Sequence, residues 1–197
     1  KAISICVGKK GIGTQEVTVQ ILGDSFVNGA FFRDALLSKN YIPGIKLVGL
    51  RNIKNEEGQY DEGRGGWTVK KYFEIPKGEM TSYHGYMQPV GEYRYWGSCE
   101  FWKNCYKVIN GELTDTEIVY NCGRYDQCIT KFDKETGYLA APKKNDLMYD
   151  NARGSYMVYT EKKWKNVEVD ERKWAFNYRK YLDMWNLDAP KFFAQML

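Results

Sequence analysis

One short stretch of the sequence carries the residue types of a covalent catalyst. Residues 17–21 alternate apolar and polar side chains, Gly23, Asp24 and Ser25 follow, and residues 30–37 then have a helical pattern. This order predicts a strand, a tight turn and a helix, with the Ser25 hydroxyl at the carboxyl end of the strand. Backbone N–H groups at a helix start stabilise a developing anion, so Ser25 is a candidate nucleophile. The alternative is that Asp24 and Ser25 only cap the helix.

A glycine-rich segment follows the next predicted strand. Residues 45–50 are a second apolar run, and residues 62–68 after it read EGRGGWT. A strand, a helix and a strand at this spacing predict a βαβ unit, in which the carboxyl ends of parallel strands share one edge. Because glycines let a backbone approach a ligand closely, an N–H group of this loop is a candidate oxyanion donor. The alternative is a flexible exposed turn, and the spacing of a phosphate-binding loop is absent.

The two segments together resemble the first two sequence blocks of the SGNH, or GDSL-type, hydrolases. Gly-Asp-Ser at residues 23–25 matches block one, and Gly-Gly-Trp-Thr at residues 65–68 matches block two. The resemblance covers mainly residues 17–72, and the wording of block two is similar to that of secreted bacterial carbohydrate or acetyl esterases.

The resemblance implies a role for each residue of the two blocks. Ser25 would be the nucleophile, and the N–H groups of Ser25 and Gly66, with Gly65 next, would hold the oxyanion. Asp24 would shape the turn. Arg64 is a candidate substrate contact, with a surface arginine as the alternative. The expected reaction removes an acetyl or similar group from a carbohydrate or small-molecule ester through an acyl-serine, without a metal or cofactor.

The fold expected from the resemblance is α/β, a three-layer flavodoxin-like parallel sheet that is incomplete in this chain. Residues 1–16 predict a strand and linker, either the end of a preceding module or an edge strand of the main domain. We assign residues 17–197 to the α/β domain, with an insertion at about residues 75–165 that is rich in aromatic residues, short strands and loops. The aromatic side chains of this insertion either stack on sugar rings or form its own core.

The cysteines point to an oxidising compartment. Cys6 stands alone, whereas the other four form two pairs of equal spacing within the insertion: Cys99, Cys105, Cys122 and Cys128. The spacing is wider than that of most zinc sites, so disulfides in an exported protein are expected, with the pairing open. The alternative is free thiols in a reducing compartment. Together with the resemblance, this favours a secreted or periplasmic bacterial protein.

Three further elements are expected toward the carboxyl end. Residues 146–159 predict a hairpin with its turn at residues 151–154. From residue 170 to residue 185, aromatic and apolar residues recur at three- and four-residue steps and predict a helix. Residues 192–197 look like the start of a buried strand.

The catalytic base that a serine needs has no clear source in the sequence. His84 is the one histidine, it lies in the insertion, and Thr81 stands where an Asp-x-x-His block requires Asp. The asparagine of the third family block is also absent. We therefore expect these 197 residues to be the front part of a longer hydrolase, inactive alone and able to self-associate if its sheet is incomplete. The alternative is a non-catalytic carbohydrate-binding or structural domain.

Charge and hydropathy exclude other classes of function. The formal net charge is +4 and no long Lys/Arg run concentrates it, so no nucleic-acid partner is expected. No apolar segment is long enough to predict a membrane span.

Overall fold

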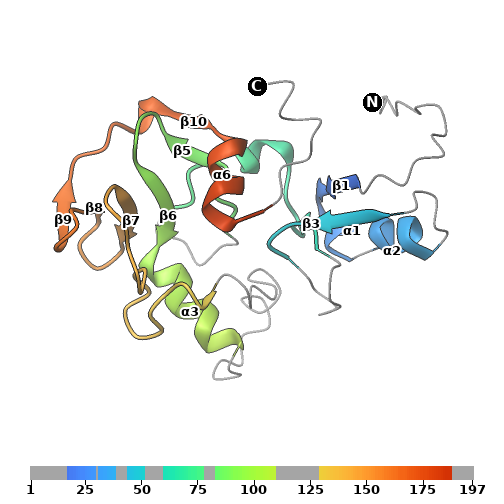
Figure 1. The fold of residues 1–197 in the computed structure, drawn as a ribbon, viewed down its shortest axis with the longest axis horizontal. Coiled ribbons are helices and arrows are strands. Elements are labelled where there is room, and N and C mark those ends of the chain that lie inside the picture. Colours follow the sequence, from blue (N-terminus) through green and yellow to red (C-terminus); the bar gives the residue numbers. More distant parts are fainter. Residues whose placement is uncertain are drawn as a thin grey trace.

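Strand pairing separates two regions of the chain, the parallel lobe (described residues of 17–64) and the aromatic lobe (described residues of 83–187). In Figure 1 the parallel lobe, coloured blue to cyan, lies on one side and the aromatic lobe, green to red, on the other. Residues 65–77 connect the lobes and include the 3-10 helix η1 (Val69–Phe73). The computed structural model describes residues 17–29, 31–38, 44–51, 60–77, 83–109 and 129–187.

The parallel lobe consists of short elements: β1 (Val17–Gln20), β2 (Leu22–Gly23), α1 (Ser25–Asn28), α2 (Phe31–Ser38), β3 (Ile45–Val48) and β4 (Glu62–Gly63). β1 pairs in parallel with β3, and β2 pairs in parallel with β4. Two helices connect β2 to β3, as the strand, helix and strand pattern predicts. The buried apolar side chains here are few: Ile21, Leu47, Val48 and Leu50.

The aromatic lobe contains β5 (Met87–Pro89), β6 (Arg94–Ser98), α3 (Cys99–Ile109), β7 (Asp146–Asp150), β8 (Ser155–Tyr159), β9 (Trp164–Val167), η2 (Glu171–Lys173), β10 (Trp174–Phe176) and α6 (Tyr178–Trp185). One sheet has the order β6-β7-β8-β9, with β6 and β7 parallel and the other pairs antiparallel. β5 and β10 form a separate antiparallel pair. The predicted hairpin is confirmed, since β7 and β8 pair from Leu147 opposite Val158 to Asp150 opposite Ser155.

Large rings fill the centre of the aromatic lobe. Trp102 stacks on Phe132 with ring centroids 3.9 Å apart and an interplanar angle of 8°. Other fully or almost fully buried rings are Tyr83, Tyr86, Tyr95 and Tyr181. Each such ring removes a large apolar area from water, so these side chains form the core that holds the short strands together. Of the two roles expected for the aromatic residues, the core role is confirmed for these.

Two predicted elements differ from the structure. The insertion is not free of helices, because α3 occupies residues 99–109. Its buried residues Cys99, Trp102 and Cys105 recur at three-residue steps, a helical period that the cysteine spacing concealed. The helix expected from residue 170 begins only at Tyr178, because residues 174–176 pair with β5 instead. There, tertiary pairing overrides the local pattern.

The α/β class is confirmed in its general form: helices combine with parallel and antiparallel strands in small sheets. The strands expected within residues 1–16 and at residues 192–197 lie outside the described residues. Within the described ranges, no helix has the length and apolar character that a membrane crossing requires.

Candidate active site at Ser25

Ser25 is the first residue of α1 and follows β2 after Asp24, and it is exposed. Asp24 caps this short helix, because its carboxylate oxygen Oδ1 accepts a hydrogen bond of 3.0 Å from the Phe26 N–H. The capping role that the sequence left open for Asp24 is thus real. It holds the turn that presents Ser25, so capping and presentation of the hydroxyl are compatible.

The Ser25 hydroxyl forms no hydrogen bond with any other described residue, although its backbone is well fixed. The Gly29 N–H donates to the Ser25 carbonyl at 2.8 Å, and the Asn28 N–H donates to the Asp24 carbonyl at 2.9 Å. A fixed backbone with an uncommitted hydroxyl is the arrangement that a nucleophile requires before a base is supplied.

The two sequence blocks lie side by side. The Glu62 N–H donates to the Ile21 carbonyl at 2.8 Å, and the Arg64 N–H donates to the Gly23 carbonyl at 2.9 Å. Since β2 and β4 are parallel and Gly23 lies opposite Gly63, both chains leave the pair at the same carboxyl edge. Ser25 follows this edge in one chain, and the glycine-rich loop follows it in the other.

Gly63 makes the close contact between the blocks possible. A Cβ atom at Gly63 would lie 2.1 Å from the Asn28 nitrogen and 2.4 Å from the Val27 carbonyl carbon. Gly23 is equally tight, because its Cβ would lie 2.4 Å from the Val27 Cγ2. Helix α1 therefore packs directly on the backbone of β4 at Gly63, which only glycine allows.

Gly65 and Gly66 occupy the centre of a tight turn. The Trp67 N–H donates to the Arg64 carbonyl at 3.1 Å and closes it. Gly66 has a φ of 71°, and a Cβ there would meet no atom within 4 Å. Positive φ at the third position of a turn favours glycine for its backbone alone, so the requirement at Gly66 is conformational and not steric.

Glu62 is the hub of a buried hydrogen-bond network beneath this loop. Its Oε1 accepts from the Leu50 N–H at 2.7 Å and from the Tyr181 hydroxyl, and its Oε2 accepts from the Arg64 guanidinium at 2.7 Å. The Tyr72 hydroxyl donates to the Glu62 carbonyl at 2.7 Å and to the Gly23 carbonyl at 2.8 Å. Because Tyr181 belongs to α6, this network joins the aromatic lobe to the strand pair that carries Ser25.

Arg64 differs from one of the expectations for it. Only 1% of the residue is exposed, and its guanidinium pairs with Glu62 and lies 5.1 Å from the centre of the Trp67 ring. The alternative of a surface arginine is wrong, whereas the substrate contact stays a prediction. Arg64 instead supports the loop from below, through a buried charge-assisted hydrogen bond and a cation–π contact.

A second set of buried charges lies under α1 and α2. Arg51 donates to the Asn28 Oδ1 at 2.9 Å, and the Asp61 Oδ1 accepts from the Gly63 N–H at 2.8 Å. The Arg33 guanidinium lies 3.7 Å from the Asp61 Oδ2. Buried polar side chains thus connect the carboxyl end of α1, at Asn28, to Arg51, and connect Arg33 of α2 to Asp61 beside β4.

Burial controls the ionisation of these groups. Burial raises the pKa of Glu62 above its usual range, although the positive charge of Arg64 lowers it. Burial also raises the pKa of Asp61, although the Gly63 N–H and the positive charge of Arg51 lower it. Burial also raises the pKa of Tyr72 to about 12, so its hydroxyl keeps the proton that it donates to two carbonyl groups.

His84 is a structural histidine. Its Nδ1 accepts from the Tyr86 N–H at 3.1 Å, and its Nε2 lies 3.1 Å from the Glu74 carbonyl, to which it donates in the neutral tautomer. The imidazole is 1% exposed and packs against Trp67 and Tyr86. Burial lowers its pKa to about 3. With both ring nitrogens bonded to backbone groups, His84 has no lone pair for the Ser25 proton, as its sequence context predicts.

The disulfide expected at Cys99 is not formed. Its thiol is free and buried, and it donates to the Asn151 Oδ1 at a distance of 3.7 Å. Burial raises the pKa of this thiol. Cys6, Cys122 and Cys128 lie outside the described residues. Within those residues, no group of His, Cys, Asp and Glu side chains is arranged to hold a metal ion.

Comparisons with known proteins were made by sequence and by structure. No protein-family model, curated protein or solved structure matches the chain. The geometry around Ser25 therefore carries what can be inferred about function.

Sequence reasoning missed the residues that support the site from beneath. Glu62 and Arg64 flank a glycine and look like ordinary surface charges in the sequence, whereas the structure buries both. Their partners Tyr72 and Tyr181 lie 10 and 119 residues from Glu62, so only the folded chain brings them together. Gly63 had a usable signal, because a glycine inside a strand marks a close backbone approach.

Proposed function

We propose that this chain carries the nucleophile and an oxyanion donor of an SGNH-type serine esterase that acts on carbohydrate esters. Ser25 Oγ would bond to the ester carbonyl carbon while its proton passes to a base. Collapse of the tetrahedral intermediate would break the ester C–O bond, and the leaving oxygen would take the proton from the base and depart as the neutral alcohol. Water would then hydrolyse the acyl-serine and release the carboxylic acid. The three-layer, flavodoxin-like sheet is part of the same proposal.

One observation supports this proposal most. Ser25 and the Gly65-Gly66 turn leave paired parallel strands at the same carboxyl edge, locked by the hydrogen bond from the Arg64 N–H to the Gly23 carbonyl. In α/β proteins this edge is where sites form. Under this proposal, the turn would supply backbone N–H groups to the region where charge would develop during attack by the Ser25 hydroxyl.

The base is the missing part of the mechanism. The resemblance places it in an Asp-x-x-His block, and His84, the one histidine of the sequence, is committed to backbone hydrogen bonds. We therefore expect near-background turnover from the 197 residues alone. Robust turnover that depends on His84 would show that the base is assigned wrongly.

The decisive experiment compares hydrolysis of p-nitrophenyl acetate by the complete natural protein and by its Ser25→Ala variant. We expect the variant to lose about 10³-fold or more in kcat, because no other group would form the acyl intermediate. Transfer of the acetyl group to Ser25, measured by peptide mass spectrometry, gives a second readout. Equal rates for the two proteins would reject Ser25 as the nucleophile.

Gly66 provides an independent test of the oxyanion role. Gly66→Ala adds no steric contact but disfavours φ of 71°, so it shifts the loop N–H groups; we expect a loss of roughly 10–100-fold in kcat. Gly91→Ala is the matched control, because Gly91 also has positive φ and open space but lies in the aromatic lobe. A loss that is equal in both variants would reject a specific role for Gly66.

The second candidate function is a non-catalytic carbohydrate-binding domain. It is favoured by the lack of a described base next to Ser25 and by a pocket in the aromatic lobe that is lined by both charged and apolar side chains. The most buried rings of that lobe are unavailable for stacking on sugars, so such binding would depend on this pocket. Equal activity of the natural protein and its Ser25→Ala variant would favour this candidate.

A further inference from the structure

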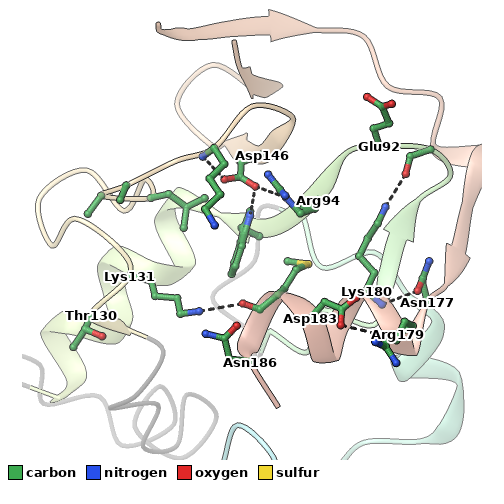
Figure 2. Close-up of a pocket in the computed structure, with 17 residues that line it drawn as sticks. Glu92, Arg94, Thr130, Lys131, Asp146, Asn177, Arg179, Lys180, Asp183 and Asn186 are labelled. Carbon is green, nitrogen blue, oxygen red and sulfur yellow. Dashed lines mark hydrogen bonds and ion pairs between the residues drawn. The ribbon is translucent and has the colours of Figure 1, made fainter. Parts of the chain in front are cut away.

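A cavity of about 830 Å³ lies in the aromatic lobe, away from the residues of the Ser25 site. It is bounded by β6, by α6 and by the segment of residues 130–143, and Figure 2 shows side chains from all three facing it. Neither Ser25 nor Gly65 nor Gly66 lines it. Its size is in the upper range of small-molecule pockets, and it is larger than one sugar ring needs.

The floor of the cavity is apolar, and most of its charged lining is basic. Trp96, Leu139, Ala140 and Met184 contribute the apolar surface. The acidic lining residues are Glu92, Asp146 and Asp183. The basic lining residues are Arg94, Lys131, Lys143, Arg179 and Lys180. The excess of positive charge favours a ligand with an anionic group.

Lys131 is held in place by its neighbours, and its ammonium group has more N–H donors than this contact uses. Its Nζ donates to the Met184 carbonyl at 3.0 Å (Figure 2). It also lies 5.5 Å and 5.4 Å from the ring centres of Trp96 and Trp185. An ammonium group has three N–H donors, so one such bond leaves others for a ligand. Because the carbonyl and the two rings fix the cation, little side-chain entropy is lost when an anion binds.

Arg94 is fixed on the opposite side of the cavity. Its Nε donates to the Asp146 Oδ1 at 2.8 Å, and its terminal nitrogen donates to the Lys144 carbonyl at 2.9 Å. A guanidinium has five N–H donors, so these bonds orient it without exhausting it. Asp146 also accepts from Trp96 and from the Lys143 N–H, so this carboxylate is part of the wall.

The remaining polar groups suit hydroxyl groups. Asp183 is 63% exposed at its side chain, and Glu92 is exposed. Asn177 and Asn186, which flank α6, add amides to the lining, although the Asn177 Oδ1 already accepts from the Lys180 N–H. Carboxylates and amides accept hydrogen bonds from hydroxyl groups, whereas exposed carboxylates repel a dianion such as phosphate. From the fixed cations, these acceptors and the apolar lining, we propose that the cavity is a binding site for an acidic saccharide, with one carboxylate held by Lys131 and another by Arg94.

Titration calorimetry with the 197-residue chain tests this proposal. The probes are a disaccharide of galacturonic acid, the neutral disaccharide of galactose, and inorganic phosphate. We expect the acidic disaccharide to bind with a Kd of roughly 0.1–1 mM and the neutral one at least about tenfold more weakly, because a charge-assisted contact is lost. Lys131→Met keeps the apolar stem and should weaken the acidic disaccharide about tenfold. Lys162→Met, an exposed lysine outside the cavity, should leave its Kd unchanged.

Each other outcome overturns the proposal. No binding of the acidic disaccharide, equal binding of the neutral one, or tighter binding of phosphate would reject the ligand class. An unchanged Kd in a folded Lys131→Met variant would reject this cavity as the position of the ligand. Lys143 also lines the cavity and is exposed, so Lys143→Met repeats the test at an exposed side chain. The site is independent of the serine chemistry, so Ser25→Ala should bind the acidic disaccharide as the unmodified chain does.

Discussion

The parallel lobe and the aromatic lobe bury different kinds of side chain. The aromatic lobe buries rings such as Trp102 and Tyr95, which stabilise it through apolar area and ring contacts. The parallel lobe has strands of two to four residues and instead buries charged groups: Arg33, Arg51, Asp61, Glu62 and Arg64. Rings tolerate small shifts, whereas buried charges need exact partners at hydrogen-bond distance.

This difference matches what each lobe has to position. Four-residue and two-residue strands cannot supply a large core, so polar bonds fix β4 against β2 and thereby fix the edge from which Ser25 projects. Buried ion pairs add little net stability but require one geometry. The hydrogen bond from the Tyr181 hydroxyl to the Glu62 carboxylate connects this edge to the ring-filled aromatic lobe.

The largest expected effect tests whether charge really holds the parallel lobe. Glu62→Gln removes the carboxylate that faces the buried Arg64 guanidinium, and we expect the free energy of unfolding to fall by about 3–5 kcal/mol. Urea unfolding monitored by circular dichroism measures it. Because the pair is buried, the loss should persist in 1 M NaCl.

Asp183→Asn is the matched control, since the Arg179–Asp183 pair has a similar distance, 3.2 Å, but is exposed at 61% and 63%. We expect about 0.5 kcal/mol or less there. If Glu62→Gln lowered the free energy of unfolding as little as Asp183→Asn does, the contrast between the two lobes would fail. Glu62 would then contribute its shape and not its charge.

The sequence predicted the elements that local periodicity determines. The strand at residues 17–21, the helix at residues 30–37 and the strand at residues 45–50 were placed within a few residues of β1, α2 and β3. The hairpin of β7 and β8 was also correct. In each case the alternation or turn chemistry lies within one short window, and the tertiary structure agrees with it.

The supports of the candidate site could not be predicted from such windows. Burial of Glu62 and Arg64 depends on Tyr181 in α6, far along the chain. Residues 174–176 were misassigned because pairing with β5 decides their structure. The helical period of residues 99–105 could have predicted helix α3, but Cys99 and Cys105 were interpreted as disulfide-forming residues, with the pairing open. Nucleophile placement is a local property, whereas activation and support of the nucleophile are long-range properties.

A smaller effect probes the aromatic lobe through its one buried imidazole. His84 has a pKa of about 3 in the fold because burial disfavours its charged form, against about 6.5 when unfolded. Between these values the unfolded chain binds more protons, so the free energy of unfolding should fall as pH drops from about 6.5 toward 3, by up to ~1.4 kcal/mol per pH unit. His84→Gln removes this contribution.

The measurement is urea unfolding at several pH values, monitored by near-ultraviolet circular dichroism because the rings around His84 dominate that signal. The buried Glu62 and Asp61 titrate in the opposite sense, so the difference between the unmodified chain and His84→Gln isolates the imidazole. Parallel pH profiles for the two chains would show that His84 is accessible to protons in the folded state. The conclusion that burial keeps this imidazole uncharged in the folded aromatic lobe would then fail.

The smallest expected effect concerns the exposed turn at the Ser25 edge. Asp24→Ala removes the carboxylate that accepts from the Phe26 N–H, and we expect a loss of about 1 kcal/mol in the free energy of unfolding. Asp24→Asn keeps an acceptor oxygen at the same place and should cost only a few tenths of a kcal/mol. If the complete natural protein hydrolyses p-nitrophenyl acetate, the Ala variant should lose more activity than its modest destabilisation explains, because the cap also orients Ser25. If the two variants were equally active, the position of Ser25 would depend on the packing of α1 against Gly63 alone, and the Asp24 cap would be dispensable for it.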